Sequence, residues 1–165
     1  MTSEPGKFWT RDVRVLLIAL WLGGALFFSF AVAPSAFAVL PSRELAGSVV
    51  SRTLKVVNVS GFVISLLLLA TAFAARQALK RNTFYMELGA LALVAASTVV
   101  GQCVIGARLA ALRAAMGRPV DELSQQDPLR VAFSSLHGYS VLALGVGMLA
   151  ALAAFFLMAR RNRTV

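Results

Sequence analysis

Four long apolar blocks constrain this chain more than any other feature of its sequence. They lie near residues 13–40, 56–75, 88–107 and 131–159. Each is long enough to cross roughly 30 Å of hydrocarbon as a helix, which takes about 20 residues. Because hydrocarbon offers no partner to a backbone amide or carbonyl, each block must satisfy its polar groups within itself. The sequence therefore predicts an all-α, integral membrane four-helix bundle.

The composition argues against a soluble fold. Of the 165 residues, 59% are hydrophobic and only 14% are charged, against about 25% charged in an ordinary soluble domain. A soluble chain with room for roughly one domain has too little interior to hide so much apolar surface. The predicted organisation is a cytoplasmic segment over residues 1–12, a transmembrane domain over 13–160 and a basic tail over 161–165.

The formal net charge of +9 would suggest nucleic-acid binding in a soluble protein. Here the basic residues gather beside the apolar blocks, as Lys7, Arg11 and Arg14, as Arg76, Lys80 and Arg81, and as Arg160, Arg161 and Arg163. Charges in such places meet anionic headgroups. The pattern predicts membrane lipids as partners and no nucleic acid.

The distribution of lysine and arginine also predicts the orientation. The two termini and the second connection carry more of them than the first and third connections, which in addition hold Glu44, Asp121, Glu122 and Asp127. We expect both termini to be cytoplasmic, in the inner membrane of a bacterium.

The first block, with "LWLGGALFFSFAVAPSAF" at its centre, has two interpretations. A basic start, an apolar middle and Ala36-Phe37-Ala38 as a cleavage site are typical of a signal peptide. The apolar stretch is longer than the usual signal sequence, which favours an uncleaved span. Pro34 either marks the exit from the membrane or kinks the helix and opens the outer half of the bundle.

Small residues predict where the helices approach one another closely. The candidates are Gly23 and Gly24 in the first helix, Ser97 and Gly101 in the third, and Ala143, Gly147 and Ala151 in the fourth. The phenylalanines of the first block then fill the space above the crossings or face lipid.

The connections carry helix start and stop signals. Ser42 is placed to cap the second helix, with Glu44 in its first turn, so that this helix begins before the membrane. The third helix is expected to run on to Gly117, whose position suits a helix-ending glycine. Asp127 and Pro128 predict the start of the fourth helix.

Polar residues are costly inside a span and are candidates for function. In an alternating bundle they all fall in the outer half of the membrane: Pro34, Asn58, Gln102, Cys103, Arg108, Ser134, His137 and Ser140. Asn58, Gly61 and Ser65 share one stripe of the second helix, and Ser134, His137, Gly138 and Val141 share one stripe of the fourth. These stripes predict faces toward partner helices or a hydrated pocket.

His137 is the single histidine. It either donates a hydrogen bond that locks the bundle, or carries a proton, a metal or a haem. Cys103, whose solitude excludes an internal disulfide, is a soft companion ligand for a metal. Arg108 either snorkels to the headgroups or places a positive charge at the mouth of the cavity.

Several kinds of site are missing. The chain has no P-loop, no HExxH, no GxSxG and no paired intramembrane carboxylates, which argues against an enzyme. No acidic residue is expected deep in any span, which argues against a carrier built on a carboxylate proton relay.

Two runs carry a family resemblance. "WLGGALFFSFAVAPSAF" supplies Trp21, Gly23, Phe28, Pro34 and Phe37, and "FSSLHGYSVLALG" supplies Phe133, His137 and Ser140. With the arginine that ends the third helix, these runs resemble the transmembrane protein 205-like family, small four-helix membrane proteins filed in bacteria as a domain of unknown function. The resemblance covers roughly residues 10–160. An asparagine expected one turn after Ser140 is absent, and Leu144 occupies that place.

The resemblance implies export or metal-related transport, and it adds Trp21 to the candidate site. Three functions follow. The first is transport, or binding of a metal or small molecule, in a polar cavity centred on His137, Asn58 and Arg108. The second is that of an accessory subunit packed against other membrane subunits or a second copy. The third is electron transfer with a bound haem or quinone.

Overall fold

The computed structural model describes residues 5–74 and 81–160, with the side chains of 12–73 and 81–160. Within these ranges every element is helical: α1 (Pro5–Phe27), the π-helical η1 (Phe28–Val32), α2 (Ala33–Val39), α3 (Arg43–Ala74), α4 (Arg81–Val99), the π-helical η3 (Val100–Gly106), α5 (Ala107–Met116), the 3-10 turn η4 (Val120–Glu122) and α6 (Pro128–Arg160). The predicted all-α class is confirmed. The side chains of Lys7, Arg11, Arg76, Lys80, Arg161 and Arg163 lie outside the described residues.

Four helical rods are long and apolar enough to cross a membrane: Asp12–Val39, Arg43–Phe73, Arg81–Met116 and Pro128–Arg160. The chain is therefore an integral membrane protein. The second and third rods extend beyond the apolar blocks, as the helix signals in the connections predict. At 1.5 Å per residue, the stretch from Glu87 to Arg108 is about 30 Å long and matches the hydrocarbon.

The helix ends form as their residues predict. The backbone N–H of Leu45 donates to Ser42 Oγ at 3.2 Å, and the N–H of Leu129 donates to Asp127 Oδ1 at 2.9 Å. Gly117 ends α5 with a φ of 62°, in the left-handed region. Glycine reaches that region without a Cβ clash, which explains why the helix stops there.

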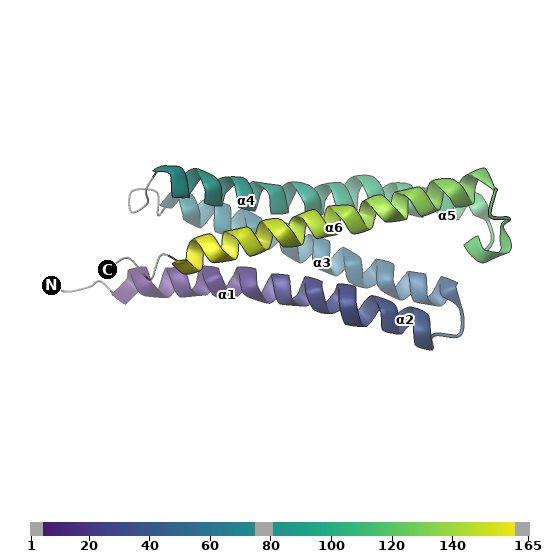
Figure 1. Cartoon of the computed structure of the whole chain (residues 1–165), viewed down its shortest axis with the longest axis horizontal. Coiled ribbons are helices and arrows are strands. Elements are labelled where there is room, and N and C mark those ends of the chain that lie inside the picture. Colours follow the sequence, from purple (N-terminus) through teal and green to yellow (C-terminus); the bar gives the residue numbers. More distant parts are fainter. Residues whose placement is uncertain (1–4, 75–80, 161–165) are drawn as a thin grey trace.

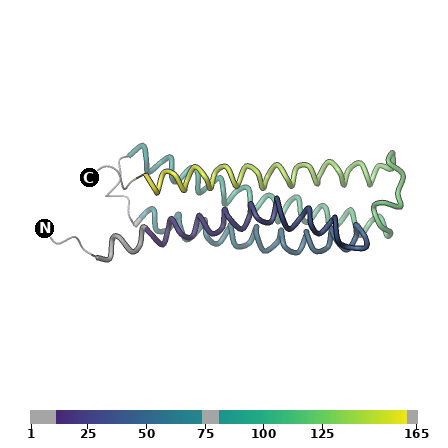
Figure 2. The backbone as a smooth tube through the Cα atoms, turned by 60° about the horizontal axis from the view of Figure 1, so that its bottom comes forward, coloured from purple at the N-terminus to yellow at the C-terminus, as the bar shows by residue number. Residues whose placement is uncertain are grey.

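The rods form an antiparallel bundle with the start of α1 and the end of α6 at one end (Figure 1). The packing order around the bundle is α1, α3, α4 and α6, and α6 closes the ring against α1. The connections from α2 to α3 and from α5 to α6 lie together at the opposite end (Figure 2). Neighbouring rods alternate in direction. The end of the first rod, the start of the second, the end of the third and the start of the fourth therefore share one half of the bundle.

Buried residues recur at alternating steps of three and four along each rod. In α4 and η3 they are Phe84, Glu87, Leu91, Val94, Thr98, Gly101 and Ile105. This spacing is the seam of a left-handed coiled-coil bundle. The main hydrophobic cluster joins residues such as Ile18, Leu68, Leu91 and Met158. The cluster occupies the half of the bundle that holds the start of α1 and the end of α6, which we call the narrow half.

The other half has a different packing. There α2 packs against α3 and η1, while α5 packs against α6 and η3. Figure 1 shows the end of α6 close to the start of α1, and the two rods moving apart toward α2 and α5. We call this part, built from η1, α2, the start of α3, η3, α5 and the start of α6, the wide half.

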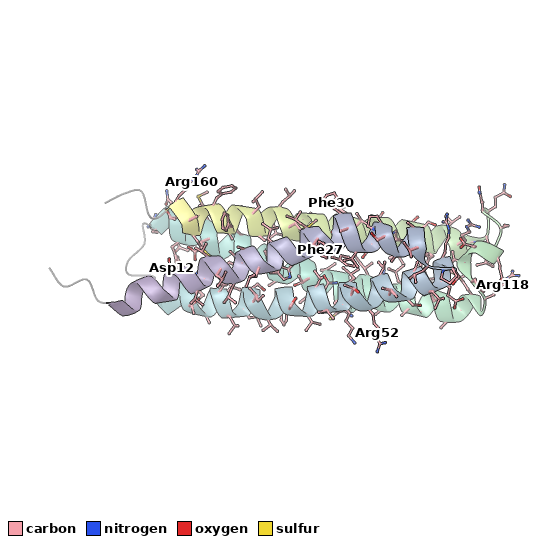
Figure 3. The ribbon with its side chains drawn as sticks, turned by 90° about the horizontal axis from the view of Figure 1, so that it is seen from below. Asp12, Phe27, Phe30, Arg52, Arg118 and Arg160 are labelled. Carbon is pink, nitrogen blue, oxygen red and sulfur yellow. The ribbon has the colours of Figure 1, made fainter. Side chains whose placement is uncertain are left out.

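The first rod contains a π-helical turn just before its proline. In η1 the N–H of Ala33 donates to Phe28 O, five residues back. A proline ring within a helix clashes with the carbonyl four residues earlier, here that of Phe30. A π-helical turn shifts those carbonyls, so that α2 continues through Pro34. Figure 3 shows the rod changing direction near Phe27 and Phe30.

The prediction that Gly23 and Gly24 make the close crossing of the first helix is wrong. A Cβ added to either glycine would meet nothing within 4 Å, whereas one added to Gly61 would lie 2.6 Å from Trp21 Cε2. The large indole of Trp21 fills the contact between α1 and α3, so the glycine that permits the approach lies on the partner helix. Among the phenylalanines of this region Phe28 is buried, while Phe27 and Phe30 are exposed along the rod's outer face.

Candidate functional site

Trp21 contacts α3 on either side of Asn58, at Val57 and Gly61, where the narrow half gives way to the wide half. Trp21 Nε1 donates to the carbonyl of Val57 at 2.9 Å. The indole lies against Gly61, and its Cη2 is 3.6 Å from a Cβ placed on Gly147. A Cβ on Gly147 would also lie 2.6 Å from Ser97 Oγ, which confirms the predicted close approach between the third and fourth spans. This tight layer closes the interior on the narrow side.

Asn58 is the most unusual polar group of the interior. It is only 4% exposed, in the middle of a membrane-length helix. No hydrogen bond joins its amide to any other described residue. Its Nδ2 lies 3.3 Å from a Cβ placed on Gly101, in the π-helical η3. Since π-helical turns are frequent at functional sites, the buried amide and η3 together mark a candidate binding position.

The stripe that contains Asn58 faces the interior as predicted. Gly61 is buried beside Trp21, and Ser65 is fully buried, with its hydroxyl donating to Phe62 O at 2.8 Å. Ser65 is thus satisfied by its own helix, in contrast to Asn58.

Ser140 is a second buried polar group of the wide half. It is 6% exposed on α6, and its hydroxyl makes no hydrogen bond with the rest of the described chain. Gln102, in η3, is half-buried and extends along its own helix, with Nε2 3.9 Å from a Cβ placed on Gly106. Asn58, Gln102 and Ser140 therefore place uncommitted polar groups on three rods of the same half.

The remaining predicted site residues lie outside. His137, Ser134, Arg108, Cys103 and Pro34 are all exposed. They share the wide half with Asn58 because the rods alternate, but no hydrogen bond connects any of them to it. The hydrogen bond that was one of the two alternatives for His137 is not formed with any described residue.

The stripe of Ser134, His137, Gly138 and Val141 on α6 is exposed throughout. The inward face of α6 consists instead of Ser140 and a ladder of small residues, including Gly147, Ala151 and Ala154. Small side chains let α6 approach α4 closely, so the ladder sets the rotation of α6 and turns the His137 stripe to the outside.

A metal site finds limited support in this arrangement. Among residues 12–73 and 81–160, no three His, Cys, Asp or Glu side chains gather closely enough to hold an ion. A metal bound by His137 or Cys103 remains a prediction that would need ligands from outside this set.

Arg113 occupies a position that the sequence did not single out. From α5 its Nη1 donates to Ser51 Oγ of α3 at 2.9 Å, and its guanidinium lies over the Phe133 ring of α6, 5.2 Å from the centroid. Its Nη2 is 3.5 Å from a Cβ placed on Gly47. The wide half has two diverging arms, α2 with the start of α3 and α5 with the start of α6, and Arg113 spans them.

A buried ion pair crosses the narrow half. Arg14 of α1 donates through Nη2 to Glu87 Oε1 of α4, and through Nη1 to Leu68 O at 3.0 Å and to Thr71 Oγ1. Glu87 is fully buried and Arg14 is 5% exposed. The sequence did not predict this pair, because Glu87 lies near the Arg81 end of the rod Arg81–Met116 and not deep in a span.

A signal for this pair exists in the sequence. Arg14 precedes Ile18, Trp21, Ala25 and Phe28 in steps of four and three, and all of these are buried. Glu87 stands in the corresponding seam of α4. A single charge on the apolar seam of each of two helices predicts a pair, whereas the sequence analysis grouped Arg14 with the basic residues beside the first block and left Glu87 just before the third block.

Comparison with known proteins adds a family. The family described as a domain of unknown function (DUF4149) matches residues 16–118. This is more than half of the chain and runs from α1 through α5, so that Asn58, Gln102 and Arg113 fall inside the match and His137 falls outside it. No curated protein and no solved structure matches the chain.

Proposed function

This chain belongs to the DUF4149 family of domains of unknown function, and from there we propose that it binds a small polar or amphiphilic molecule within the membrane, as the first step of transport or export. The family description assigns no activity, so the proposal rests on the wide half of the bundle. One observation carries it: the Asn58 amide is buried in a membrane-length helix without a hydrogen-bond partner among the described residues.

The physical reason is the cost of an unsatisfied amide. Removing such a group from water without a new partner costs roughly 2–7 kcal/mol in apolar surroundings. The side chain offers one carbonyl acceptor and two N–H donors. A ligand that presents a hydroxyl, amide or carbonyl group recovers this energy, and the neutral amide suits a neutral polar group of the ligand.

Other groups of the wide half extend the proposed site. Ser140 and Gln102 supply further hydrogen-bonding groups from α6 and η3. His137, Ser134 and Arg108 are exposed on the same half and are assigned to its entrance. Pro34 and η1 bend the first rod where the arms diverge. The sequence also resembles the transmembrane protein 205-like family, and this resemblance implies a role in export. It agrees with the proposal and remains a prediction.

A specific observation favours a second candidate, the accessory subunit. Ser134, His137 and Gly138 form an exposed polar and small stripe on a membrane-length helix. Polar groups are unfavourable against lipid, and small residues permit close helix contacts. Another membrane subunit or a second copy of this chain would cover the stripe.

The test is purification of the full chain in mild detergent, followed by mass spectrometry of all small molecules and proteins that remain bound. We expect a polar or amphiphilic molecule with the wild type and its loss from Asn58→Ala. Ser65→Ala is the matched control, because Ser65 lies on the same buried stripe but bonds its own helix. Equal small-molecule content in Asn58→Ala and wild type would refute the proposed site.

The same experiment separates the alternatives. A partner chain retained by wild type and lost from His137→Leu, with no bound small molecule, would support the accessory subunit instead. A haem or quinone lost from Asn58→Ala would identify the ligand class and the electron-transfer function. A metal lost from His137→Ala would identify the metal role.

A further inference from the structure

We propose that the guanidinium of Arg113 binds a phosphate group, either a lipid headgroup phosphate or a free phosphate anion. This inference rests on the proposed function of the wide half and names the charged end of the molecule bound there. The juxtaposition that carries it is a cation held between two arms of the bundle by neutral groups alone.

Arg113 makes different contacts from Arg43 and Arg130, two other arginines at this end. Arg43 is paired with Asp121 at 3.8 Å, and Arg130 donates to Leu123 O at 2.6 Å. Arg113 meets a hydroxyl and an aromatic face. No carboxylate of the described residues lies within 4.0 Å of its guanidinium nitrogens. The site therefore holds a positive charge that lacks a counter-ion from within the described chain.

The donors that remain suit a phosphate. A guanidinium has five N–H donors in a fixed planar fork, and the bond to Ser51 uses one of them. Ser51 Oγ accepts that bond and keeps its own O–H to donate. Phosphate oxygens accept several such bonds at once, and arginine is the residue that meets them in bidentate geometry. The Phe133 ring fixes the plane of the fork through a cation–π contact.

The depth of Arg113 matches the headgroup layer. The stretch from Glu87 to Arg108 spans about 30 Å, the thickness of the hydrocarbon. Arg113 lies just over one turn beyond Arg108 on α5. A phosphate held at Arg113 thus lies at the membrane surface, while the attached chains of a lipid would reach toward the layer of Asn58.

Two probes with the same acyl chains test this directly. Phosphatidic acid and diacylglycerol differ only in the phosphate, and inorganic phosphate supplies that group without a lipid. Binding to the purified full chain is measured by native mass spectrometry for wild type, Arg113→Gln, Arg113→Lys and the control Arg52→Gln. Arg52 follows Ser51 on α3, and its side chain points away from the bundle (Figure 3). Arg52→Gln therefore removes the same charge as Arg113→Gln without changing the proposed site.

We expect wild type and Arg52→Gln to retain phosphatidic acid at least tenfold better than diacylglycerol. Arg113→Gln should lose that preference, and Arg113→Lys should lose most of it, because an ammonium keeps the charge but not the planar fork. If wild type binds inorganic phosphate saturably, Arg113→Gln abolishes that binding and phosphatidic acid is not retained, the ligand is free phosphate.

The inference is overturned if Arg113→Gln binds phosphatidic acid and inorganic phosphate as wild type does. It is also overturned if wild type neither prefers phosphatidic acid over diacylglycerol nor binds inorganic phosphate. If Arg113 only stabilises the fold, Arg113→Gln will lower the thermal stability, but the folded fraction will still prefer phosphatidic acid over diacylglycerol. Failure of the wide-half proposal is read separately, from an unchanged set of bound molecules in Asn58→Ala.

Discussion

Single side chains in this bundle are set by contacts that span two or three rods. Trp21 joins α1 to the carbonyl of Val57 and fills the space that Gly61 leaves open. Arg14 reaches across to Glu87. In both cases a bulky or charged residue on one rod depends on a small or complementary residue on another, so the effect of a substitution is decided by the partner.

The Trp21–Gly61 contact predicts opposite outcomes for two glycines. Gly61→Ala places a methyl group against the indole and disturbs its hydrogen bond to Val57, and overpacking of this kind costs about 1–3 kcal/mol. Gly23→Ala meets open space and should leave stability unchanged or slightly raised. Thermal unfolding of the purified variants in detergent measures both. Equal midpoints for the two variants would contradict the close contact.

The Arg14–Glu87 pair predicts a rescue. Arg14→Met removes the guanidinium that pairs with the buried Glu87 carboxylate, and breaking such a pair should cost about 3–5 kcal/mol. Arg14→Met combined with Glu87→Leu replaces the pair by apolar groups and should recover most of that loss. Detergent unfolding of the single and double variants gives the coupling energy. A double variant that is no more stable than Arg14→Met would show that the pair is not a coupled unit.

The helical rods differ in where they depart from α-helical geometry. η1 precedes Pro34 in the first rod, and η3 lies opposite Asn58 in the third. Both departures fall at the start of the wide half, where the arms separate. A π-helical turn holds an extra residue, so that the helix beyond it is rotated with respect to the helix before it.

Pro34→Ala should let Phe28–Val32 return to α-helical geometry, because the ring no longer displaces the Phe30 carbonyl. We expect α2 to rotate and the arm to shift by several Å. Spin labels on Val39→Cys and Val131→Cys, both at exposed positions, report the separation of the arms in a Cys103→Ser background. Pro41→Ala, in the connection after α2, is the control. Unchanged distances in Pro34→Ala would assign the bend to another cause.

The complete bundle places both described ends of the chain at one end of the molecule (Figure 1). Lysine and arginine counts predict that this end faces the cytoplasm. The wide half, with Asn58 and Arg113, then opens toward the opposite face of the membrane.

This orientation is tested with an impermeant maleimide on intact cells. In a Cys103→Ser background, Arg118→Cys, which lies just beyond α5, should be labelled from outside. A fluorescent protein fused to the C-terminus should mature in the cytoplasm. Labelling of residue 118 only after the cells are broken would reverse the orientation.

The sequence predicted the class of fold because apolar length and backbone satisfaction in hydrocarbon leave few alternatives. The caps at Ser42, Gly117 and Asp127 were predictable for a similar reason, since they depend on residues within one turn. The burial of Asn58 and Ser65 on one stripe also followed from helical spacing. The exposure of His137 and the packing of Gly61 rather than Gly23 did not follow.

Local chemistry thus accounts for four membrane-length helices, their capped ends and the occurrence of Asn58, Gln102 and Ser140 in one half of the bundle. The rotation of each rod was decided by packing between rods, because lipid provides no hydrophobic drive and close contact among small residues selects the facing surfaces. That packing buried Glu87 beside Arg14 and turned His137 outward. It also brought Arg113 between Ser51 and Phe133, three residues that are far apart in the chain and meet only when the bundle is assembled.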